Sequence, residues 1–395
     1  MKKLLACCRS LVVLAAVAIL LNLSNVSCFP LQVAVIGVIA PLDAGLAEFG
    51  QGIRNAVQLA VDEANASCCM LGWRFEMVAL DDSSDPATGA AAAQALAADP
   101  RTVGVVGTYN SGVAAEVAPI LAAAGIPMIS PGNTDPALTL GDDWENPVRP
   151  HANYFRVVAS DADQGPFLAQ YAYDVMQVRN AAVVTETKPV SKGLADAFTE
   201  AFEGLGGTIL ITEDLEPGTT DYQPALERVA AANPELLFFG GEYEVGAAVR
   251  LQAEAEGITA PMMGGDGLKA PAYIEAVGVA CEGDIASTVG APAASLPSAQ
   301  AFLDAYEAAG FEAPPSDFGP YAYDAANVLI AAARDNLRFG RPVSTADRQA
   351  ISDAVQATDT NGITGPISFD AFGDTTNRVL TAYQVTGGAW VAQGQ

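Results

Sequence analysis

The sequence predicts an α/β protein with two doubly wound, Rossmann-like lobes, joined by a multi-strand hinge and separated by a ligand cleft. Short apolar runs of strand length alternate with segments that carry apolar residues at helical spacing. A loop rich in Gly, Asp, Asn and Pro at 131–150 interrupts this alternation, and a second series of similar size follows it. Two successive α/β units predict two lobes, and such folds bind ligands at the carboxyl ends of their strands.

The first series opens with a continuous apolar run at 32–38 (QVAVIGV), followed by a helical pattern at 51–65. Runs of this kind are typical of buried parallel strands that are covered by helices on both faces. We expect further strands at 75–80, 103–107 and 127–130, with helices at 86–98 and 113–124.

The second series repeats the pattern, and Gly or Asn stands at the expected helix ends. Its strands are expected at 181–185, 208–212, 236–240 and 261–264. Its helices are expected at 161–176, 194–205, 222–232 and 244–257.

The last hundred residues contain no third α/β unit and are expected to complete the two lobes. Helices at 297–310 and 321–336 are followed by strand pieces around Ile367 and at 379–385, and Gly387-Gly388 predicts a hairpin to 389–391. We therefore expect lobe 1 to contain 30–159 and 290–365, and lobe 2 to contain 160–289 and 366–395.

The N-terminus has the pattern of an export signal at 1–28. Three basic residues flank or precede an apolar run at 11–23 that is short for a membrane span, and no later apolar stretch reaches the ~20 residues that a span needs. A membrane anchor is the second interpretation of this segment. Val26-Ser27-Cys28 is typical of a lipoprotein cleavage site, but Asn25 stands where such sites usually carry Leu, so lipidation of Cys28 and plain cleavage both stay open.

Beyond the predicted signal, the chain has three cysteines, Cys68, Cys69 and Cys281, and three is an odd number for a disulfide framework. A bond between the adjacent pair would be strained, whereas a bond from either to Cys281 would join distant segments. We favour buried or unreactive thiols over both.

The charge and the motifs exclude several classes of function. A formal charge of −27 makes nucleic acid and anionic membranes poor partners. The single histidine, His151, excludes sites that need several histidines. The chain has no Gly-x-Ser-x-Gly elbow and no phosphate loop. We therefore expect no enzymatic activity, no metal and no cofactor.

Two polar loops are the strongest candidates for a ligand site. Gly107 to Gly112 (GTYNSG) runs from a strand end into a helix start, where Ser111 and free backbone N–H groups can meet a carboxylate. The competing interpretation of Ser111 is a simple helix N-cap. A second such loop at 130–136 (SPGNTDP) also follows a strand. The two loops are therefore expected to converge on one wall of the cleft.

The sequence resembles the branched-chain amino acid and amide-binding family of type I periplasmic binding proteins over nearly the whole mature chain. Eight segments match in the family's order. They are IGVIAPLDAGLAEFGQGIRNAVQLAVDEANA, LDDSSDPATGAAAAQAL, VGTYNS, GIPMISPGNTDPALT, NYFRVVASDADQG, LFFGGEY, MMGGDG and FGPYAYDAANVLIAA.

The resemblance implies roles for individual residues. Ser111 and Thr134 would donate hydrogen bonds to the α-carboxylate of an amino acid, the carbonyl of Gly132 would accept from its α-ammonium, and Asp266 would pair with that ammonium. A turn aspartate is the competing interpretation of Asp266. The aromatic residues Phe49, Tyr109 and Tyr321 would line the pocket, although a tyrosine at helical spacing, such as Tyr321, is more often a core residue.

Two positions depart from the family pattern. Val190-Ser191 stands where relatives have a Tyr-Gly pair, so an aromatic ligand contact is missing. Glu242 stands where relatives have an aromatic or small residue facing the cleft. If Glu242 faces inward, it favours a polar or cationic ligand side chain. If it faces outward, it is a solvated carboxylate at a helix start, and we favour this second alternative.

These features predict a monomeric solute-binding protein, in the periplasm or on the outer face of the cytoplasmic membrane. It would capture a branched-chain or other small amino acid for the permease subunits of an ABC-type importer. The alternatives are a sensor subunit and a protein that binds amides, urea or related solutes. For an uncharged amide, Asp266 would have no ionic partner.

Overall fold

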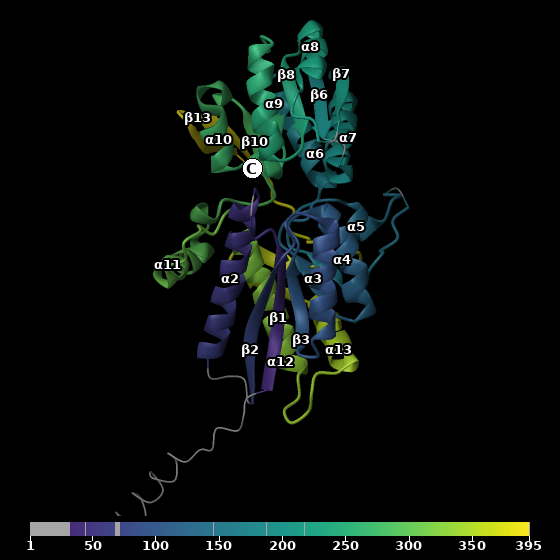
Figure 1. The fold of residues 1–395 in the computed structure, drawn as a ribbon, viewed down its shortest axis with the longest axis vertical. Helices are drawn as coiled ribbons and strands as arrows, with labels where there is room; N and C mark the ends of the chain where they lie inside the picture. The colour runs from purple at the N-terminus through teal and green to yellow at the C-terminus, as the bar shows by residue number, and fades with distance from the viewer. Residues whose placement is uncertain are drawn as a thin grey trace, which may run out of the picture.

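The computed structural model describes residues 32–43, 45–67, 72–144, 146–186, 188–216 and 218–394 (Figure 1). The predicted export signal with Cys28, and the adjacent Cys68 and Cys69, lie outside these residues. Within the described ranges, no helix has the length and hydropathy to cross a membrane. Cys281 is described, and it is a buried free thiol whose Sγ donates a hydrogen bond to the carbonyl of Gly278.

Lobe 1 is built on a five-stranded parallel sheet of order β2-β1-β3-β4-β5. The central strands β1 and β3 are almost entirely buried, as their apolar runs predict. One face of the sheet packs on α2 and α12, and the other on α3 and α4. The strands are β1 (Gln32–Ala40), β2 (Trp73–Asp81), β3 (Thr102–Gly107), β4 (Met128–Ser130) and β5 (Tyr154–Arg156). The helices are α2 (Ala47–Ala66), α3 (Pro86–Ala98), α4 (Ser111–Ala123), α5 (Ala137–Leu140), α11 (Gln300–Ala309), α12 (Gly319–Asn336) and α13 (Thr345–Gln356).

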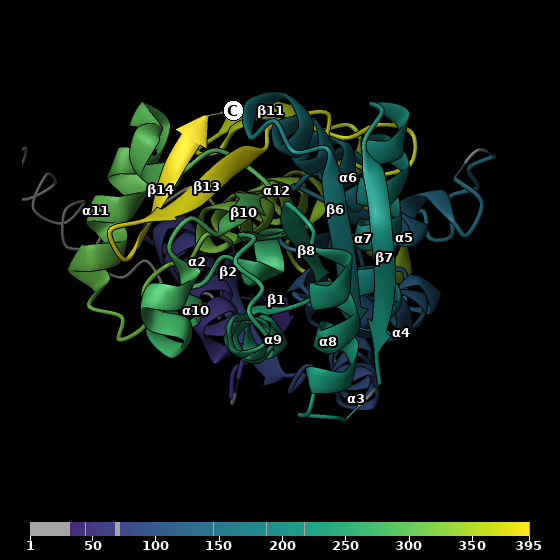
Figure 2. The same cartoon turned by 90° about the horizontal axis from the view of Figure 1, so that it is seen from above.

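Lobe 2 is built on a seven-stranded sheet of order β14-β13-β10-β9-β8-β6-β7, which Figure 2 shows from above. The five strands from β10 to β7 are parallel, and the hairpin β13–β14 adds an antiparallel edge. The strands are β6 (Asn180–Glu186), β7 (Thr208–Leu215), β8 (Leu236–Gly240), β9 (Met262–Gly264), β10 (Ile285–Thr288), β13 (Thr381–Thr386) and β14 (Ala389–Gly394). The helices are α6 (Asp161–Gln170), α7 (Pro189–Gly204), α8 (Gln223–Ala232), α9 (Tyr243–Ala255) and α10 (Pro271–Val277).

The hairpin at Gly387-Gly388 is confirmed. Both glycines have positive φ, 61° and 78°, as a two-residue turn between twisted strands requires.

Shorter helical turns and a small second sheet complete the chain. The last turn of the helix predicted at 161–176 is a π-turn, η1 (Tyr171–Val175). Short 3₁₀ turns lie at η2 (Asp266–Leu268), η3 (Gly278–Cys281), η4 (Ala293–Ser295) and η5 (Pro297–Ala299), and a small separate sheet pairs β11 (Asp359–Gly362) with β12 (Gly365–Ser368).

Each predicted strand and helix is present, but several elements were not predicted. β5 and β10, with three and four residues, were not predicted, whereas β4 and β9, with three residues each, were predicted from apolar runs. The helix α13 has a polar sequence, although its capping box at Ser344 and Asp347 is a recognisable start signal. The helix predicted from residue 113 begins at Ser111.

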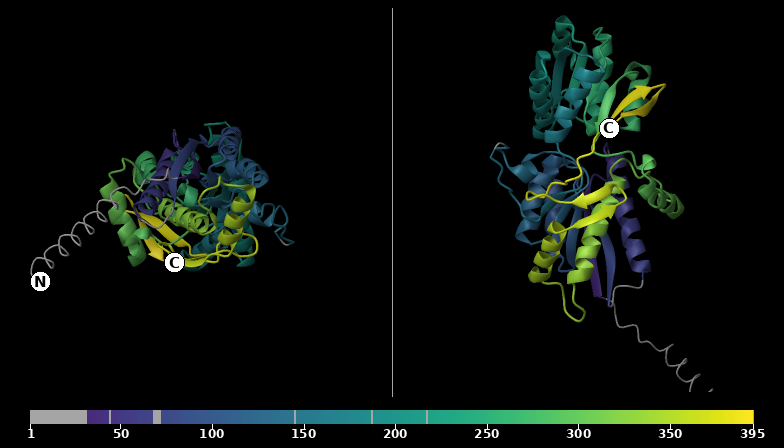
Figure 3. Two further views of the ribbon diagram at one scale, coloured as in Figure 1. Left: turned by 90° about the horizontal axis from the view of Figure 1, so that it is seen from below. Right: turned by 180° about the vertical axis from the view of Figure 1, so that it is seen from behind.

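The chain passes between the lobes three times: after β5, after β10 and before β13. Figure 3 shows the last of these crossings from behind, where the C-terminal segment runs from lobe 1 into lobe 2. The exact division at residues 159, 289 and 365 stays a prediction, and β12 spans the last of these boundaries.

A buried ion pair joins the lobe 1 ends of two crossings. Arg156, at the end of β5, is fully buried, and its Nε lies 2.5 Å from Asp374 Oδ1. The same guanidinium donates to the carbonyls of Asn133 and Asp135, at 3.1 and 2.9 Å, and to the hydroxyl of Thr139. A charge that is buried this deeply is tolerated only when its donors are satisfied.

We predict that Asp374→Ala destabilises the protein by about 3–5 kcal/mol, because it leaves the Arg156 guanidinium buried without a counter-ion. Asp304→Ala, which removes an exposed carboxylate on α11, serves as the control and should cost about 0.5 kcal/mol or less. Denaturant-induced unfolding followed by circular dichroism measures both. Equal losses in the two variants would show that the Arg156 pair does not contribute to stability.

Candidate functional site

A cavity of about 470 Å³ lies between the lobes, and residues from both lobes line it. Its polar residues follow the carboxyl ends of seven parallel strands: β2, β3, β4 and β5 in lobe 1, and β6, β8 and β9 in lobe 2. Parallel sheets place ligands at this edge. The cavity therefore occupies the position that the fold predicts for a ligand.

Ser111 begins α4, but it is not the helix N-cap. The N-cap is Asn110, and the Ser111 hydroxyl accepts hydrogen bonds from the backbone N–H groups of Thr134 and Asp135, at 3.2 and 3.3 Å. The first N–H groups of a helix have no intrahelical acceptor, and the helix dipole favours a negative charge there. The structure thus brings Ser111 and Thr134 together at a position suited to an anion.

The loop that carries Gly132 and Thr134 is held by its own side chains. Asn133 is fully buried, donates to the carbonyl of Tyr109 at 2.8 Å, and accepts from the Tyr154 hydroxyl at 3.0 Å. The Ser130 hydroxyl accepts from the backbone N–H groups of Gly132 and Asn133. These bonds fix the loop before any ligand arrives.

Two buried carboxylates also face the cavity, and one of them, Asp161, adjoins Thr134, because its backbone N–H donates to the Thr134 carbonyl at 2.8 Å. Asp266 follows β9 and is 9% exposed, and Asp161 begins α6 and is 1% exposed. The side-chain amide of Gln164 donates to both, at 2.9 Å to Asp161 and 3.0 Å to Asp266. Its oxygen accepts from the Asp266 backbone N–H and from Ser287. Gln164 therefore holds the two carboxylates side by side.

Burial raises the pKa of both carboxyl groups. For Asp266 the pKa rises to about 6, although the bond from Gln164 opposes the shift. For Asp161, burial and the neighbouring charge of Asp266 raise the pKa to about 8. No basic side chain in the described part of the chain forms an ion pair with either carboxyl group, so a positively charged ligand group at this position would favour their ionised forms. The sequence analysis did not identify Asp161 as a site residue. Asp161 lies in the segment NYFRVVASDADQG, which resembles the family, and it directly follows a strand and a crossing between the lobes.

Glu242 faces the cavity, so our favoured interpretation of it as a solvated carboxylate is wrong. Its side chain is 18% exposed and pairs with Lys188 Nζ at 2.8 Å, and it accepts from Asn110 of lobe 1 at 2.5 Å. Burial raises the Glu242 pKa, whereas Lys188 lowers it. Lys188 also pairs with Glu186 at 2.9 Å. Ser191 lines the same wall.

The predicted aromatic residues divide between the cavity and the core. Tyr109 lines the cavity, but Phe49 does not reach it: Phe49 is 1% exposed and stacks behind Tyr109 with ring centroids 4.8 Å apart. Phe318 and Tyr243 pack on the edge of Phe49, and the Tyr243 hydroxyl donates to the Gly45 carbonyl across the two lobes at 2.7 Å. Phe49 therefore supports the ligand wall rather than forming it.

The prediction that Tyr321 lines this cavity is also wrong. It lies on α12 and lines a separate hollow of about 30 Å³ beside Thr288 and Gly290, at the second crossing. The core interpretation of this tyrosine describes its position better, because it is 7% exposed.

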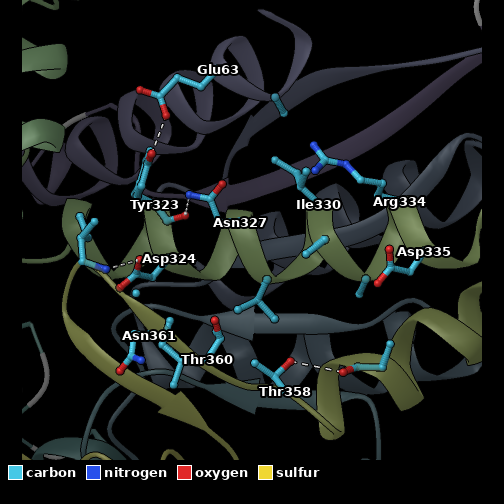
Figure 4. Close-up of a pocket in the computed structure, with 18 of the residues that line it drawn as sticks. Glu63, Tyr323, Asp324, Asn327, Ile330, Arg334, Asp335, Thr358, Thr360 and Asn361 are labelled. Atoms are coloured by element: carbon cyan, nitrogen blue, oxygen red, sulfur yellow. Dashed lines mark hydrogen bonds between the residues drawn. The ribbon is translucent and has the colours of Figure 1, made fainter. Parts of the chain in front are cut away.

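A larger cavity of about 710 Å³ lies on lobe 1 between α2, α12, α13 and β11 (Figure 4). Several of its polar groups are engaged with each other. Asp324 accepts from Ile363 and Thr364, and the Tyr323 hydroxyl donates to Glu63. These bonds attach α2 and the turn between β11 and β12 to α12.

No group of three His, Cys, Asp or Glu residues is placed to hold a metal ion in the part of the chain that the structure describes.

Comparisons with known proteins identify a family over nearly the whole chain. The sequence profile of a family described as periplasmic binding protein matches residues 34–389. A Leu/Ile/Val-binding protein, BraC3, of Rhizobium johnstonii is 29% identical over 358 residues, which cover 90% of this chain and 93% of that protein. Leu/Ile/Val-binding protein homolog 2 of Brucella abortus is 30% identical over 341 residues, 86% of each chain.

Two solved structures resemble the chain along nearly its whole length. The leucine-binding protein LivK of Thermotoga maritima has a TM-score of 0.79 and 27% identity, covering 91% of this chain and 98% of that one. The branched-chain amino acid transporter substrate-binding protein LivJ of Streptococcus pneumoniae, in complex with isoleucine, also has a TM-score of 0.79 and 27% identity. That comparison covers 92% of this chain and 99% of LivJ.

We predict that the ligand-free protein loses stability between pH 5 and 8, and that Asp161→Asn reduces this loss. The Asp161 carboxyl releases its proton near pH 3.8 when unfolded and near pH 8 when folded. Between these values the folded state binds more protons, so stability falls as pH rises, by about 1.4 kcal/mol per pH unit at most. Denaturant unfolding at pH 5 and 8 measures the difference, and Asp196→Asn on the surface of α7 is the control. Identical pH slopes for wild type and Asp161→Asn would contradict the burial of an ionisable Asp161.

Proposed function

We propose that this chain, which belongs to the periplasmic binding protein family, captures an amino acid outside the cytoplasm and delivers it to an ABC-type importer. The observation that carries the proposal is that the two walls of one cavity match the two charges of a zwitterion. Lobe 1 supplies hydroxyl and N–H donors at a helix start, and the opposite wall supplies carboxylates. The names of the relatives, which refer to Leu, Ile and Val or to amino acids, support the same class of ligand.

The α-carboxylate of the ligand would bind Ser111 and Thr134. The Thr134 N–H group now donates to the Ser111 hydroxyl over a rather long 3.2 Å. A carboxylate between them would accept from both hydroxyls and from the N–H groups of the α4 start, and hydrogen bonds to an ionised acceptor are the stronger kind.

The α-ammonium would bind the carbonyl of Gly132, Asp266 and Asp161. An ammonium group donates three hydrogen bonds, and these three acceptors would satisfy them. Its charge would also stabilise the ionised forms of the two carboxyl groups that Gln164 holds together. Asp161 is thus an addition to the ligand set that the sequence predicted.

A ligand that contacts both walls of the cavity favours the form in which the lobes are closed. A ligand shifts such an equilibrium only through contacts that exist in one state and not in the other. Ser111 belongs to lobe 1 and Asp266 to lobe 2, so a zwitterion makes both sets of bonds only when the lobes approach. The membrane subunits of an importer would then recognise the closed form.

Several further features belong to this proposal. The chain acts as a monomer without catalytic activity, and residues 1–28 direct it out of the cytoplasm, with or without a lipid on Cys28. Lobe 1 is formed by 30–159 and 290–365 and lobe 2 by 160–289 and 366–395, with movement at the three crossings.

We predict that Asp266→Asn weakens amino acid binding by about 30-fold or more, because losing one partner of a buried charge pair costs about 2 kcal/mol or more. The matched control, Asp335→Asn on the exposed part of α12, should leave affinity unchanged. Isothermal titration of the refolded, ligand-free protein measures both. If the ligand is an uncharged amide instead, Asp266→Asn will have a mild effect, and the proposed recognition of an ammonium will be wrong.

A further inference from the structure

The cleft holds more negative charge than a simple zwitterion can neutralise. Asp161, Asp266 and Glu242 face the cavity with largely buried side chains, and Lys188 is the one cation among the described residues that line it. Lys188 is already shared between Glu242 and the buried Glu186, so this three-residue group has a net charge of −1. An amino acid with a neutral side chain adds no net charge and leaves the excess unchanged.

Glu242 lies close to the expected position of the ligand. A Cβ atom placed on Gly267, the residue after Asp266, would lie 3.6 Å from Cγ of Glu242. The two carboxylate-bearing segments are therefore in contact. Both carboxylates also act on the same ring, since their charges contribute to raising the pKa of Tyr109, after the larger effect of its burial. A ligand held at Asp266 thus has Glu242 within reach of its side chain.

The wall between these carboxylates suits an aliphatic stem. A Cβ on Gly265 would lie 2.5 Å from Leu194, so the Leu194 side chain covers the backbone next to Asp266. Leu194 lines the cavity together with Ser191 on the same helix. Long basic side chains commonly lay their methylene groups on an apolar surface and direct the charged end to polar partners.

We infer that the cleft selects an L-amino acid whose side chain ends in a cationic nitrogen, as in lysine, ornithine or arginine, and that Glu242 is the specificity-determining residue. The inference rests on the proposed capture of an amino acid. The stem lies along Leu194, and the cationic end displaces part of the Lys188 interaction at Glu242. An acidic side chain is disfavoured, because its carboxylate would lie beside the carboxylate of Glu242. An aliphatic side chain leaves Glu242 buried without gaining a charge partner.

Titration calorimetry of the purified, refolded protein against lysine, ornithine, arginine, leucine, isoleucine, valine, glutamine and glutamate tests the inference. At least one basic amino acid should bind about tenfold or more tightly than leucine and glutamine. Glu242→Gln should reduce that preference by about tenfold or more, since it keeps the size of the side chain and removes its charge. Glu254→Gln, an equal change on the exposed face of α9, should preserve the preference. Thermal unfolding of each variant shows whether the fold is intact.

The outcomes separate the two proposals. Tight binding of leucine, isoleucine or valine, with basic amino acids weaker, would overturn the cationic specificity and leave amino acid capture in place. Tighter binding of glutamine than of any basic amino acid would overturn it in the same way, as would an unchanged preference in folded Glu242→Gln. Absence of binding by all eight amino acids would overturn the proposed function itself.

Discussion

The hinge and the ligand loop both depend on one buried cation, the guanidinium of Arg156. It binds the carbonyl groups on either side of Thr134 and the carboxylate of Asp374, which lies on the segment leading into the third crossing. A buried guanidinium requires partners for its donors, so these three segments cannot separate without leaving a charge unpaired. The end of β5, the Thr134 loop and the C-terminal return segment therefore move as one body, and the carboxylate-binding wall is formed before a ligand arrives.

The two walls of the cleft divide their chemistry. Ser111 and Thr134 present neutral donors, which suit an anion, and the more exposed carboxylates Glu116 and Asp135 also line this part of the cavity. The largely buried carboxylates are those of Asp161, Asp266 and Glu242. A dipolar ligand therefore has one favourable orientation, and its reversed orientation would set a carboxylate against three others. Orientation is thus determined by the distribution of charge, while the shape of the cavity and the carboxylate at its far side decide which side chain is accepted.

The sequence predicted the layers of the fold well because buried parallel strands and amphipathic helices leave strong periodic patterns. The segments VGVVG and LLFFG form the inner strands β3 and β8. The predicted family is confirmed by the profile that matches residues 34–389. The short strands β5 and β10 were missed; β5 (Tyr154–Arg156) includes a charged residue and so lacks the continuous apolar run by which the equally short β4 and β9 were predicted. Within the site, Ser111, Thr134, Gly132, Tyr109 and Asp266 line one cavity, and their binding to a ligand stays a prediction. The errors concern side-chain direction: Glu242 faces in, Tyr321 faces a different hollow, and Phe49 stands behind Tyr109. The direction in which a side chain points depends on how segments far apart in the chain pack together. A local sequence pattern does not carry that information.

Polar contacts between protein groups cross directly from one lobe to the other, among them those from Asn110 to Glu242, from Tyr243 to the Gly45 carbonyl and from Lys269 to Asp317. They form between protein groups alone and do not require a solute as an intermediary. A captured molecule leaves only while such bonds are broken, so its residence time is governed by the opening rate of the lobes as well as by its own contacts. Changes at Asn110 or Tyr243 would therefore alter how long a solute stays bound, even where the groups that touch the solute are unchanged.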